Sequence, residues 1–444
     1  MVYMILFYLL SGWEPEIKIS DSPGNYVHIY EGNVLALDKN NGVFVVWVKE
    51  SLPYHFIYFS RSLDGGMSFE SQKKVFPFDA SSPNISADQN GILYLAFTQY
   101  IGGNYYTVLY KSTDRGETWN NVSTIGFGNC LYMFVDEENI IHCLYTGNDL
   151  GYNVTLAYAR SIDGGITWHK NILNTSTQLS SIVFFQFIKD KFGNLHLVCL
   201  RDTTSTLSGN IYYKRGLNNG NQWEPFIKLN QITQRATVPK IAVDSVNNVY
   251  VTWGIHPGFG SPNYRGKLFV AKSTNGGQNF SQEVIANGLI DSLRSSFNHY
   301  ISFDGEKLVL FNIWKYDTQL RLYLAKSVDG INWSEDTFLT PSYPYPKGPG
   351  TPFTITKRDT YHLVFLNTPI GGEILDDDIY YKRYVKTPVN SKERFTLSFY
   401  NFSKEESIVY SIDGRKISFY ERNLKRGIYF GKFKRKSLKI LKIK

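Results

Sequence analysis

The chain has 444 residues, of which 43% are hydrophobic and 19% are charged, a balance typical of a globular protein and not of a disordered one. Its 16% aromatic residues and 36 glycines favour short strands and tight turns over helices. Residues 388–444 hold 15 Lys/Arg and 5 Asp/Glu, whereas the remainder holds 32 and 34, so the net charge of +8 belongs to the C-terminal part and we expect no nucleic-acid partner.

No cofactor or metal site is expected, because the P-loop, the dinucleotide-binding glycine fingerprint and the H-E-x-x-H motif are all absent. The three cysteines Cys130, Cys143 and Cys199 form no C-x-x-C pair and have no histidine at ligand spacing. We expect buried thiols, with a disulfide or a reactive thiol as the alternatives. After the first residues no apolar run of 18 residues occurs, so no transmembrane segment is expected.

Residues 1–12 read MVYMILFYLLSG, a short apolar run that ends in small residues. This pattern resembles the apolar core and cleavage site of a secretory signal peptide, although the basic start is missing. The alternatives are a buried strand or a mis-set start codon. We therefore predict a signal peptide over 1–12 and an exported protein.

A hairpin pattern recurs along the chain from residue 35. Each copy has an apolar segment, an aspartate, an Asn/Gly turn and a second alternating apolar run, which together predict a β-hairpin. The aspartates of these turns are Asp38, Asp88, Asp136, Asp190, Asp244 and, in shorter versions, Asp304 and Asp359.

A second motif, Ser-x-Asp-x-Gly-x-x-Trp, follows each of the first six hairpins at intervals of about 50 residues. Ser and Asp side chains can bond backbone N–H groups, Gly allows positive φ, and the aromatic residue can pack between sheets. We therefore expect a structural role for these residues. They are Ser62, Asp64, Gly66; Ser112, Asp114, Gly116, Trp119; Ser161, Asp163, Gly165, Trp168; Asn218, Gly220, Trp223; Ser273, Asn275, Gly277; Ser327, Asp329 and Trp333.

Each repeat therefore predicts four antiparallel strands, and such units repeated radially form a β-propeller. A seventh hairpin at 353–366 is followed by a strand at 379–384 but by no fourth strand. Residues 13–20 (WEPEIKIS) mirror 223–230 (WEPFIKLN), the fourth strand of the fourth unit. We predict an all-β, seven-bladed propeller over 13–387, whose N-terminal strand completes the last blade beside 379–384 and removes an open edge.

The Ser-x-Asp-x-Gly-x-x-Trp motif resembles the Asp-box, or BNR, repeat of the sialidase superfamily over residues 13–385. Sialidases of this family usually have six blades, whereas this chain counts to seven. The resemblance implies that functional loops lie on the face opposite the boxes. It also implies three arginines that grip a carboxylate, a Tyr–Glu nucleophile and an Asp acid/base. The family's Arg-Ile-Pro element is absent, since residues 20–26 read SDSPGNY.

The loops on the predicted functional rim carry candidate site residues. A fork of guanidiniums can hold a carboxylate, and aromatic rings can stack on sugars or pack around the pore. His55 has no evident partner, and the acidic run 376–378 is expected to be solvated and not a calcium site. The binding candidates are Arg201, Arg235, Arg294, Tyr100 and Trp314, and the catalytic candidates are Glu50, Asp202, Tyr316 and Asp317.

Residues 388–444 form a second, basic unit with β-like segments at 409–417, 424–430 and 437–444. Their order resembles the C-terminal sorting domain of the type IX secretion system, which implies the secretion machinery as a partner. The alternatives are a small basic β-domain or a solvated tail.

These features predict a secreted or cell-surface protein that engages extracellular glycans or other polymers through its rim, as a binding or adhesion module. The alternative is an exo-sialidase-type glycoside hydrolase that uses the rim arginines with Tyr/Glu and Asp.

Overall fold

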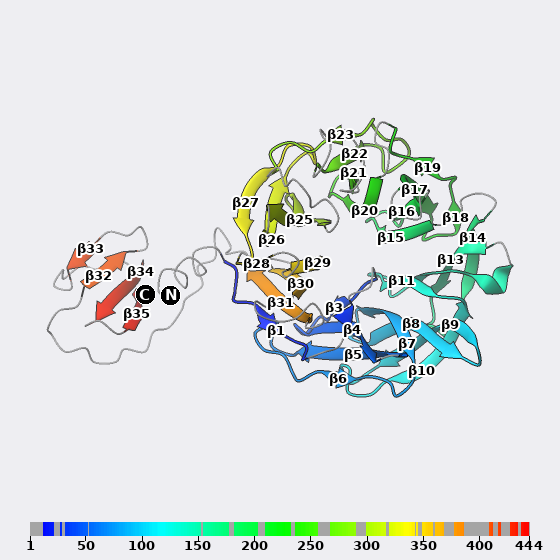
Figure 1. Ribbon diagram of the computed structural model, residues 1–444, viewed down its shortest axis with the longest axis horizontal. Helices are drawn as coiled ribbons and strands as arrows, with labels where there is room; N and C mark the ends of the chain where they lie inside the picture. The colour runs from blue at the N-terminus through cyan, green and yellow to red at the C-terminus, as the bar shows by residue number, and fades with distance from the viewer. Residues whose placement is uncertain are drawn as a thin grey trace. The chain divides into compact units, whose positions relative to one another are not determined.

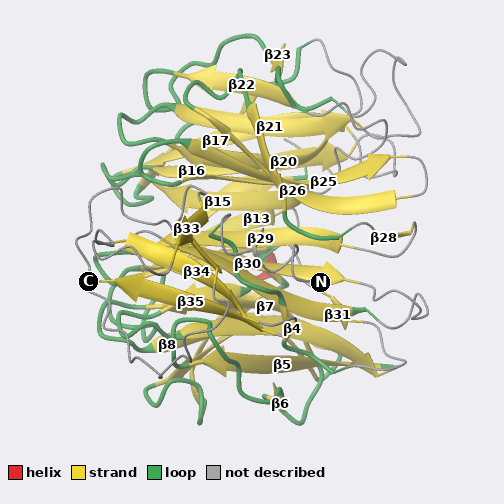
Figure 2. Cartoon of the chain, turned by 90° about the vertical axis from the view of Figure 1, so that its left-hand side faces the viewer, coloured by secondary structure: helices red, strands yellow, loops and turns green. Residues whose placement is uncertain are grey.

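The computed structural model describes residues 12–21, 27–28, 32–51, 53–151, 154–176, 182–202, 209–231, 236–255, 267–289, 299–316, 319–341, 343–344, 349–357, 360–367 and 377–385, and C-terminal strands within 408–443. The chain divides into two compact units, residues 1–386 and 387–444. Strands dominate the described residues, whose one helical turn is the 3-10 segment η1 at Asn148–Leu150 (Figure 2).

The strands between residues 17 and 385 form antiparallel sheets. The largest, of nine strands, consists of two halves joined by the single pair Gly209↔Ala236, so seven sheet units follow one another along the chain. We number them sheet 1 to sheet 7, and Figure 1 shows them arranged around a ring. The all-β class and the repeated four-stranded unit are as predicted.

The strand bounds of the first four sheets are as follows. Sheet 1 comprises β2 (Val27–His28), β3 (Leu35–Leu37), β4 (Val43–Ser51), β5 (Tyr54–Ser62) and β6 (Lys73–Lys74). Sheet 2 comprises β7 (Ala80–Ala87), β8 (Leu93–Ile101), β9 (Asn104–Ser112) and β10 (Asn120–Phe127). Sheet 3 comprises β11 (Cys130–Val135), β12 (Ile141–Tyr145), β13 (Val154–Ser161) and β14 (His169–Thr175). Sheet 4 comprises β15 (Ile182–Lys189), β16 (Leu195–Asp202), β17 (Gly209–Leu217), β18 (Gln222–Trp223) and β19 (Ile227–Lys228).

The remaining sheets repeat this order. Sheet 5 comprises β20 (Ala236–Val243), β21 (Val249–Ile255), β22 (Phe269–Ser273) and β23 (Val284–Ile285). Sheet 6 comprises β24 (His299–Phe303), β25 (Leu308–Tyr316), β26 (Gln319–Ser327), β27 (Ser334–Phe338) and β28 (Tyr343–Pro344). Sheet 7 comprises β29 (Pro349–Lys357), β30 (Thr360–Asn367), β31 (Asp378–Val385) and β1 (Ile17–Lys18).

The outer strand of sheet 7 comes from the other end of the chain. Ile17 pairs with Tyr381, and an isolated bridge joins Trp13 to Tyr384. Arg383 forms a bidentate pair with Glu14, with both N···O distances at 2.6 Å. Residues 13–18 therefore lie beside β31 in antiparallel register.

Asp378 strengthens the same seam. Its carboxylate accepts a hydrogen bond from Ser20 Oγ at 2.6 Å and pairs with Lys18 Nζ at 2.6 Å. The side chain is buried at the start of β31. The expectation that the acidic run 376–378 is solvated is therefore wrong for Asp378. Its partners Lys18 and Ser20 lie near the other end of the chain, so the local sequence around residue 378 does not indicate them.

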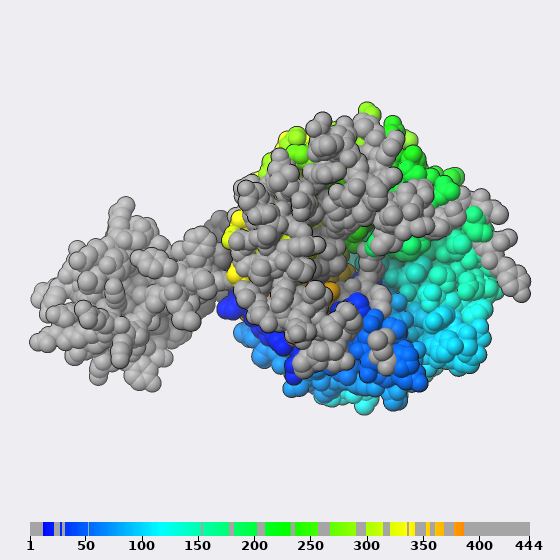
Figure 3. All heavy atoms as spheres, in the orientation of Figure 1, coloured from blue at the N-terminus to red at the C-terminus, as the bar shows by residue number. Residues whose placement is uncertain are grey.

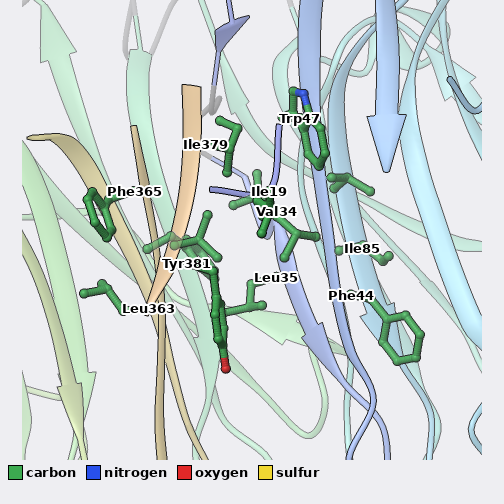
Figure 4. Packing of buried hydrophobic residues seen from close by; sticks show 14 of the residues in the cluster. Ile19, Val34, Leu35, Phe44, Trp47, Ile85, Leu363, Phe365, Ile379 and Tyr381 are labelled. Atoms are coloured by element: carbon green, nitrogen blue, oxygen red, sulfur yellow. The ribbon is translucent and has the colours of Figure 1, made fainter. Parts of the chain in front are cut away.

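The core lies between consecutive sheets. Figure 4 shows Ile19, which follows β1, and Ile379 of β31 close to Val34, which precedes β3, with Trp47 of β4 nearby; all four side chains are buried in one cluster. Burial of such apolar surface contributes roughly 25 cal/mol per Å². The sheets are thus held to their neighbours mainly by apolar packing.

A hydrogen-bond pattern also joins neighbouring sheets. An arginine on the third strand of one sheet donates to a backbone carbonyl in the Ser-x-Asp turn of the next. The pairs are Arg61 with Arg115 O, Arg160 with Asn219 O, Arg215 with Gly276 O, and Arg383 with Gly65 O. The last pair joins sheet 7 to sheet 1 in the same way as the others join consecutive sheets.

The second unit contains a four-stranded antiparallel sheet in the order β33-β32-β34-β35. Its strands are β32 (Ile408–Ser411), β33 (Lys416–Ser418), β34 (Gly427–Phe433) and β35 (Ser437–Ile443). Within the described residues, no helix has the length and hydropathy needed to cross a membrane.

Candidate functional site

The Ser-x-Asp turns use their polar side chains within the turn. Ser62 Oγ donates to Asp64 Oδ1 at 2.6 Å and accepts from the Gly66 N–H at 2.8 Å. Asp64 Oδ1 also accepts from the N–H groups of residues 67 and 68. The same Ser–Asp or Ser–Asn bond recurs in the turns at 112–114, 161–163, 273–275 and 327–329. The side chains of these aspartates and of Asn275 are therefore hydrogen-bonded within their own turns.

Ionisation of these aspartates follows from that geometry. Burial raises the pKa of Asp114, but hydrogen bonds from Ser112 and Thr118 outweigh it and bring the value to about 2. A carboxylate held so firmly in its charged form is a poor proton donor near neutral pH. The turns therefore fit a structural role better than a catalytic one.

The hairpin aspartates form buried chains that the sequence analysis did not predict. Asp190 Oδ2 lies 3.1 Å from His196 Nε2, and His196 Nδ1 lies 2.7 Å from the Tyr213 hydroxyl. Asp136, His142 and Tyr158 repeat the arrangement in sheet 3. Both histidines are fully buried, so these chains link strands and do not reach a substrate.

The opposite face carries the loops between second and third strands and the crossovers between sheets. Of the predicted site residues, Arg235, Arg294 and Asp317 lie outside the described residues. Asp202 and Tyr316 are the last residues of β16 and β25, and Trp314 lies two residues before the end of β25; the side chains of these three residues are outside the described part of the chain. The arginine cluster therefore stays a prediction.

Arg201 is the predicted arginine that the structure describes. It sits near the end of β16, paired with Ile182 and Asn210. Its Nε is buried, and no hydrogen-bond partner for that atom occurs among the described residues. Arg201 is thus placed at this rim, as expected, with donor capacity left over.

Glu50, a predicted catalytic candidate at the end of β4, is the centre of a polar cluster. Its Oε1 lies 2.8 Å from His28 Nε2 and 3.5 Å from His55 Nε2. The His55 backbone N–H donates to Asp79 Oδ1 at 2.8 Å, and its Nδ1 lies 3.6 Å from the same oxygen. His55, which has no evident partner in the sequence, therefore stands between two carboxylates.

Exposed tyrosines end two hairpins at the same rim. Tyr100 and Tyr105 face each other across the β8–β9 hairpin with ring centroids 5.2 Å apart, and they are 47% and 51% exposed. Tyr54, at the tip of the β4–β5 hairpin, is 55% exposed. Tyr100 therefore does not pack around a pore, and its ring can be reached from solvent.

The strand register places the two groups at the same end of sheet 2. Asp79 immediately precedes Ala80, which pairs with Gln99, the neighbour of Tyr100. The side chain of Asp79 contacts His55 of sheet 1, whereas Tyr100 shares the strand parity of Tyr94 and Ala96, which pack towards sheet 3. We call His28, Glu50, His55, Asp79, Tyr54, Tyr100 and Tyr105 the rim patch. In Figure 3 the described atoms of sheets 1 to 3, coloured blue to cyan, form one continuous surface.

The sequence could have indicated part of this patch. Tyr105 lies opposite Tyr100 across Ile101-Gly102-Gly103-Asn104, and a Gly-Gly turn predicts that pairing. His28 lies on the two-residue strand β2 and Asp79 in the crossover from sheet 1 to sheet 2, and no local sequence pattern indicates the neighbours of either residue.

The middle of the ring is crossed by hydrogen bonds between inner strands. The Tyr300 hydroxyl on β24 bonds with Tyr132 on β11 and with Gln186 on β15. Burial raises the pKa of Tyr300 to about 12, so the hydroxyl stays protonated. These side chains thus connect sheets 3, 4 and 6 near the centre of the ring.

The thiols are buried and unbridged, as predicted for Cys130, Cys143 and Cys199. Burial raises the pKa of Cys199, which keeps it in the unreactive thiol form. No group of three His, Cys, Asp or Glu side chains suited to a metal ion occurs within the described part of the chain.

The ring of four-stranded antiparallel sheets defines the chain as a β-propeller. No protein-family model and no curated protein matches it. Among solved structures it is similar to the phage phi92 endosialidase (10% identity, TM-score 0.52), covering 94% of this chain and 76% of that one. It is also similar to the GH93 α-L-arabinofuranosidase of Fusarium graminearum with arabinobiose (12%, 0.51; 84% and 98%). A PL25 ulvan lyase bound to -[GlcA(1-4)Rha3S]- gives 12% identity and a TM-score of 0.57 (84% and 96%). At such identities the likeness shows the fold alone.

Proposed function

We propose that residues 13–387 form a seven-bladed propeller, completed by its N-terminal strand, that binds extracellular glycans or related polymers through the rim patch. The seven sheet units and the pairing of β1 with β31 support the blade count and the completed ring. The three similar structures are named for proteins that act on carbohydrates, which supports the ligand class.

The observation that carries this proposal is the exposed pair Tyr100 and Tyr105, which lies at the same rim as Glu50 and Asp79. Tyrosine combines a flat apolar ring with a polar hydroxyl, and such residues are enriched at binding surfaces. Sugar rings offer apolar C–H faces to aromatic rings and hydroxyl groups to carboxylates and imidazoles, and the rim patch supplies both kinds of partner.

Glycan-array binding, followed by titration of the strongest ligand, tests the proposal. Tyr100→Ala combined with Tyr105→Ala should weaken binding at least about tenfold, which corresponds to about 1.4 kcal/mol. Phe192→Ala is the matched control, because Phe192 is 64% exposed on the face of the Ser-x-Asp turns. A wild-type protein that retains no glycan, or a double variant that binds as well as the control, would refute it.

A second candidate is a glycoside hydrolase, favoured by the position of Glu50 between two imidazoles with Asp79 nearby. Two carboxylates in one site can serve as acid and base or nucleophile. Glu50→Gln should then abolish release of reducing ends while glycan binding persists. The sialidase form of this function, with Arg201, Arg235 and Arg294 holding a carboxylate, predicts that replacing all three arginines abolishes release of acidic sugar.

Export belongs to the same proposal. The apolar segment 1–12 and the basic unit 388–444 support secretion or surface attachment, with the C-terminal unit serving as the sorting signal. Fractionation of native cells should find the protein in the medium or at the surface, and removal of 388–444 should retain it inside. A wild-type protein confined to the cytoplasm would contradict the proposal.

A further inference from the structure

Positive charge is concentrated in the second unit. Residues 388–444 hold 15 Lys/Arg against 5 Asp/Glu, whereas the rest of the chain holds 32 against 34. Within 415–444 the imbalance is steeper, with 12 Lys/Arg and a single acidic residue, Glu421. Even if every acidic side chain of 388–444 forms an ion pair, ten basic side chains remain without a counter-charge, and such an excess attracts polyanions.

The four strands of this unit carry lysines and no acidic residue. Lys416 lies on β33, Lys432 on β34, and both Lys439 and Lys442 on β35, whereas β32 has no charged residue. Lysine is almost never fully buried unless its charge is paired. Since these strands supply no carboxylate, we expect their lysines to meet water or a negatively charged ligand.

The strand register assigns three of these lysines to one face of the sheet. Ile428, Phe430 and Lys432 are alternate residues of β34, so they share a face. Lys442 lies opposite Ile428, and Lys416 lies in the cross-strand row of Phe430. Lys416, Lys432 and Lys442 therefore belong to the same face.

The three lysines of the shared face are spread across the sheet. Neighbouring strands lie about 4.8 Å apart and residues advance about 3.4 Å along a strand, so the Cα atoms of these lysines are about 12–16 Å from one another. Lysines at such distances suit a polymer with repeated negative charges better than a single small anion. Tyr410 and Phe430 occupy the cross-strand row of Lys416, so the same face also carries two aromatic residues. We call Lys416, Lys432, Lys442, Tyr410 and Phe430 the lysine face.

We propose that the lysine face binds an acidic polysaccharide. Its ammonium groups complement the carboxylates or sulfates of such a polymer, and aromatic rings pack against the apolar C–H faces of sugars. The export proposed above brings the unit among extracellular polymers, which favours an acidic polysaccharide over a nucleic acid. This site belongs to a different unit from the rim patch, so binding at either site can fail without the other.

Titration of the full-length protein with oligogalacturonate, which is acidic, and with a neutral maltooligosaccharide of equal length tests this site. Tyr100→Ala and Tyr105→Ala are present in every titration, so that the tyrosines of the rim patch do not contribute. Binding of oligogalacturonate should exceed that of the neutral probe and should weaken between about 0.05 M and about 0.5 M salt, because salt screens the charges. Lys416→Gln with Lys432→Gln and Lys442→Gln should weaken binding at least about tenfold, since one lysine near an anionic surface contributes roughly a factor of five.

Two matched controls separate the lysine face from net charge and from folding. Lys39→Gln with Lys228→Gln and Lys307→Gln removes the same charge from exposed positions of the first unit and should leave binding unchanged.

The second control compares single substitutions on opposite faces of one strand. Lys439 lies opposite Gly431 and therefore on the other face from Lys442. Lys442→Gln should weaken binding severalfold, whereas Lys439→Gln should not, and both variants keep the strand pairing of β34 with β35.

Each contrary outcome has a distinct meaning. Oligogalacturonate that binds no better than the neutral probe overturns the site, and equal losses in Lys442→Gln and Lys439→Gln overturn its assignment to one face. Single-stranded DNA or phosphatidylglycerol vesicles that bind more tightly than oligogalacturonate overturn the ligand class. All these results leave glycan binding at the rim patch standing, because that function is tested with the tyrosines intact.

Discussion

Replacement of Gly277 by alanine measures how much the contact between consecutive sheets contributes to stability. Gly277 lies in the Ser-x-Asp turn of sheet 5 with φ at +85°, and a Cβ there would lie 2.7 Å from Tyr213 Cζ. Ordinary carbon–carbon contacts are about 3.5–4.0 Å, so one side must move. Tyr213 is fully buried and bonded to His196, which leaves it little freedom to do so.

Gly103 provides the matched control. Its φ is +86° and no atom lies within 4 Å of a built Cβ, so Gly103→Ala introduces the backbone strain alone. That strain costs about 1–2 kcal/mol. Gly277→Ala adds overpacking, which typically costs about 1–3 kcal/mol, so its total should reach about 2–5 kcal/mol. Urea unfolding followed by tryptophan fluorescence measures both variants. Equal destabilisation by the two substitutions would refute the role assigned to this contact.

Three further predictions concern the stability of the ring. Asp378→Asn should lower the free energy of unfolding by about 1–3 kcal/mol, because the buried site loses its charge pair with β1; an unchanged urea midpoint would show that the seam contributes little. Arg215→Met should destabilise through loss of its bonds to Glu224 and the next turn, and should cost more than a substitution of the exposed Lys73. Burial raises the pKa of Asp190, but hydrogen bonds, the largest from His196, lower it to about 2. The stability that this carboxylate adds is therefore full above about pH 4 and is lost as the pH falls towards 2. The urea midpoint of unfolding should decline over that range, and a midpoint that does not change with pH would contradict a stabilising role for the Asp190–His196 contact.

The repeat was enough to predict the order of strands in the ring. The spacing of the Ser-x-Asp turns defines one four-stranded unit each, and the likeness of 13–20 to 223–230 places the N-terminal strand. Glu14 and Glu224 occupy matching positions, and each forms a bidentate pair with an arginine of its third strand, Arg383 or Arg215. Repetition makes such contacts predictable, because equivalent residues meet equivalent neighbours.

The candidate site was predicted only in part, because it departs from that repetition. Glu50 and Tyr100 stand at hairpin ends, which the repeat locates, so they could be proposed as rim residues. His28 lies on the short strand β2 and reaches Glu50 through its pairing with β4, whereas Asp79 lies in the crossover from sheet 1 to sheet 2 and reaches His55 through the packing of these two sheets. Such pairings depend on how strands and sheets meet in the fold, and no local pattern in the sequence indicates them.

The two faces of the ring differ in how tightly their residues are packed, and this difference explains why we expect the binding function on the rim. On one face, the turn serines, aspartates and glycines are bound by their own turn or packed against the preceding sheet, as Gly66 is against Tyr381. A substitution there disturbs two sheets at once. The β8–β9 hairpin on the other face ends in Gly102 and Gly103, where an added Cβ would meet no atom within 4 Å. We therefore expect that substitutions of Tyr100 and Tyr105 on this hairpin alter ligand binding while the contacts between sheets stay intact.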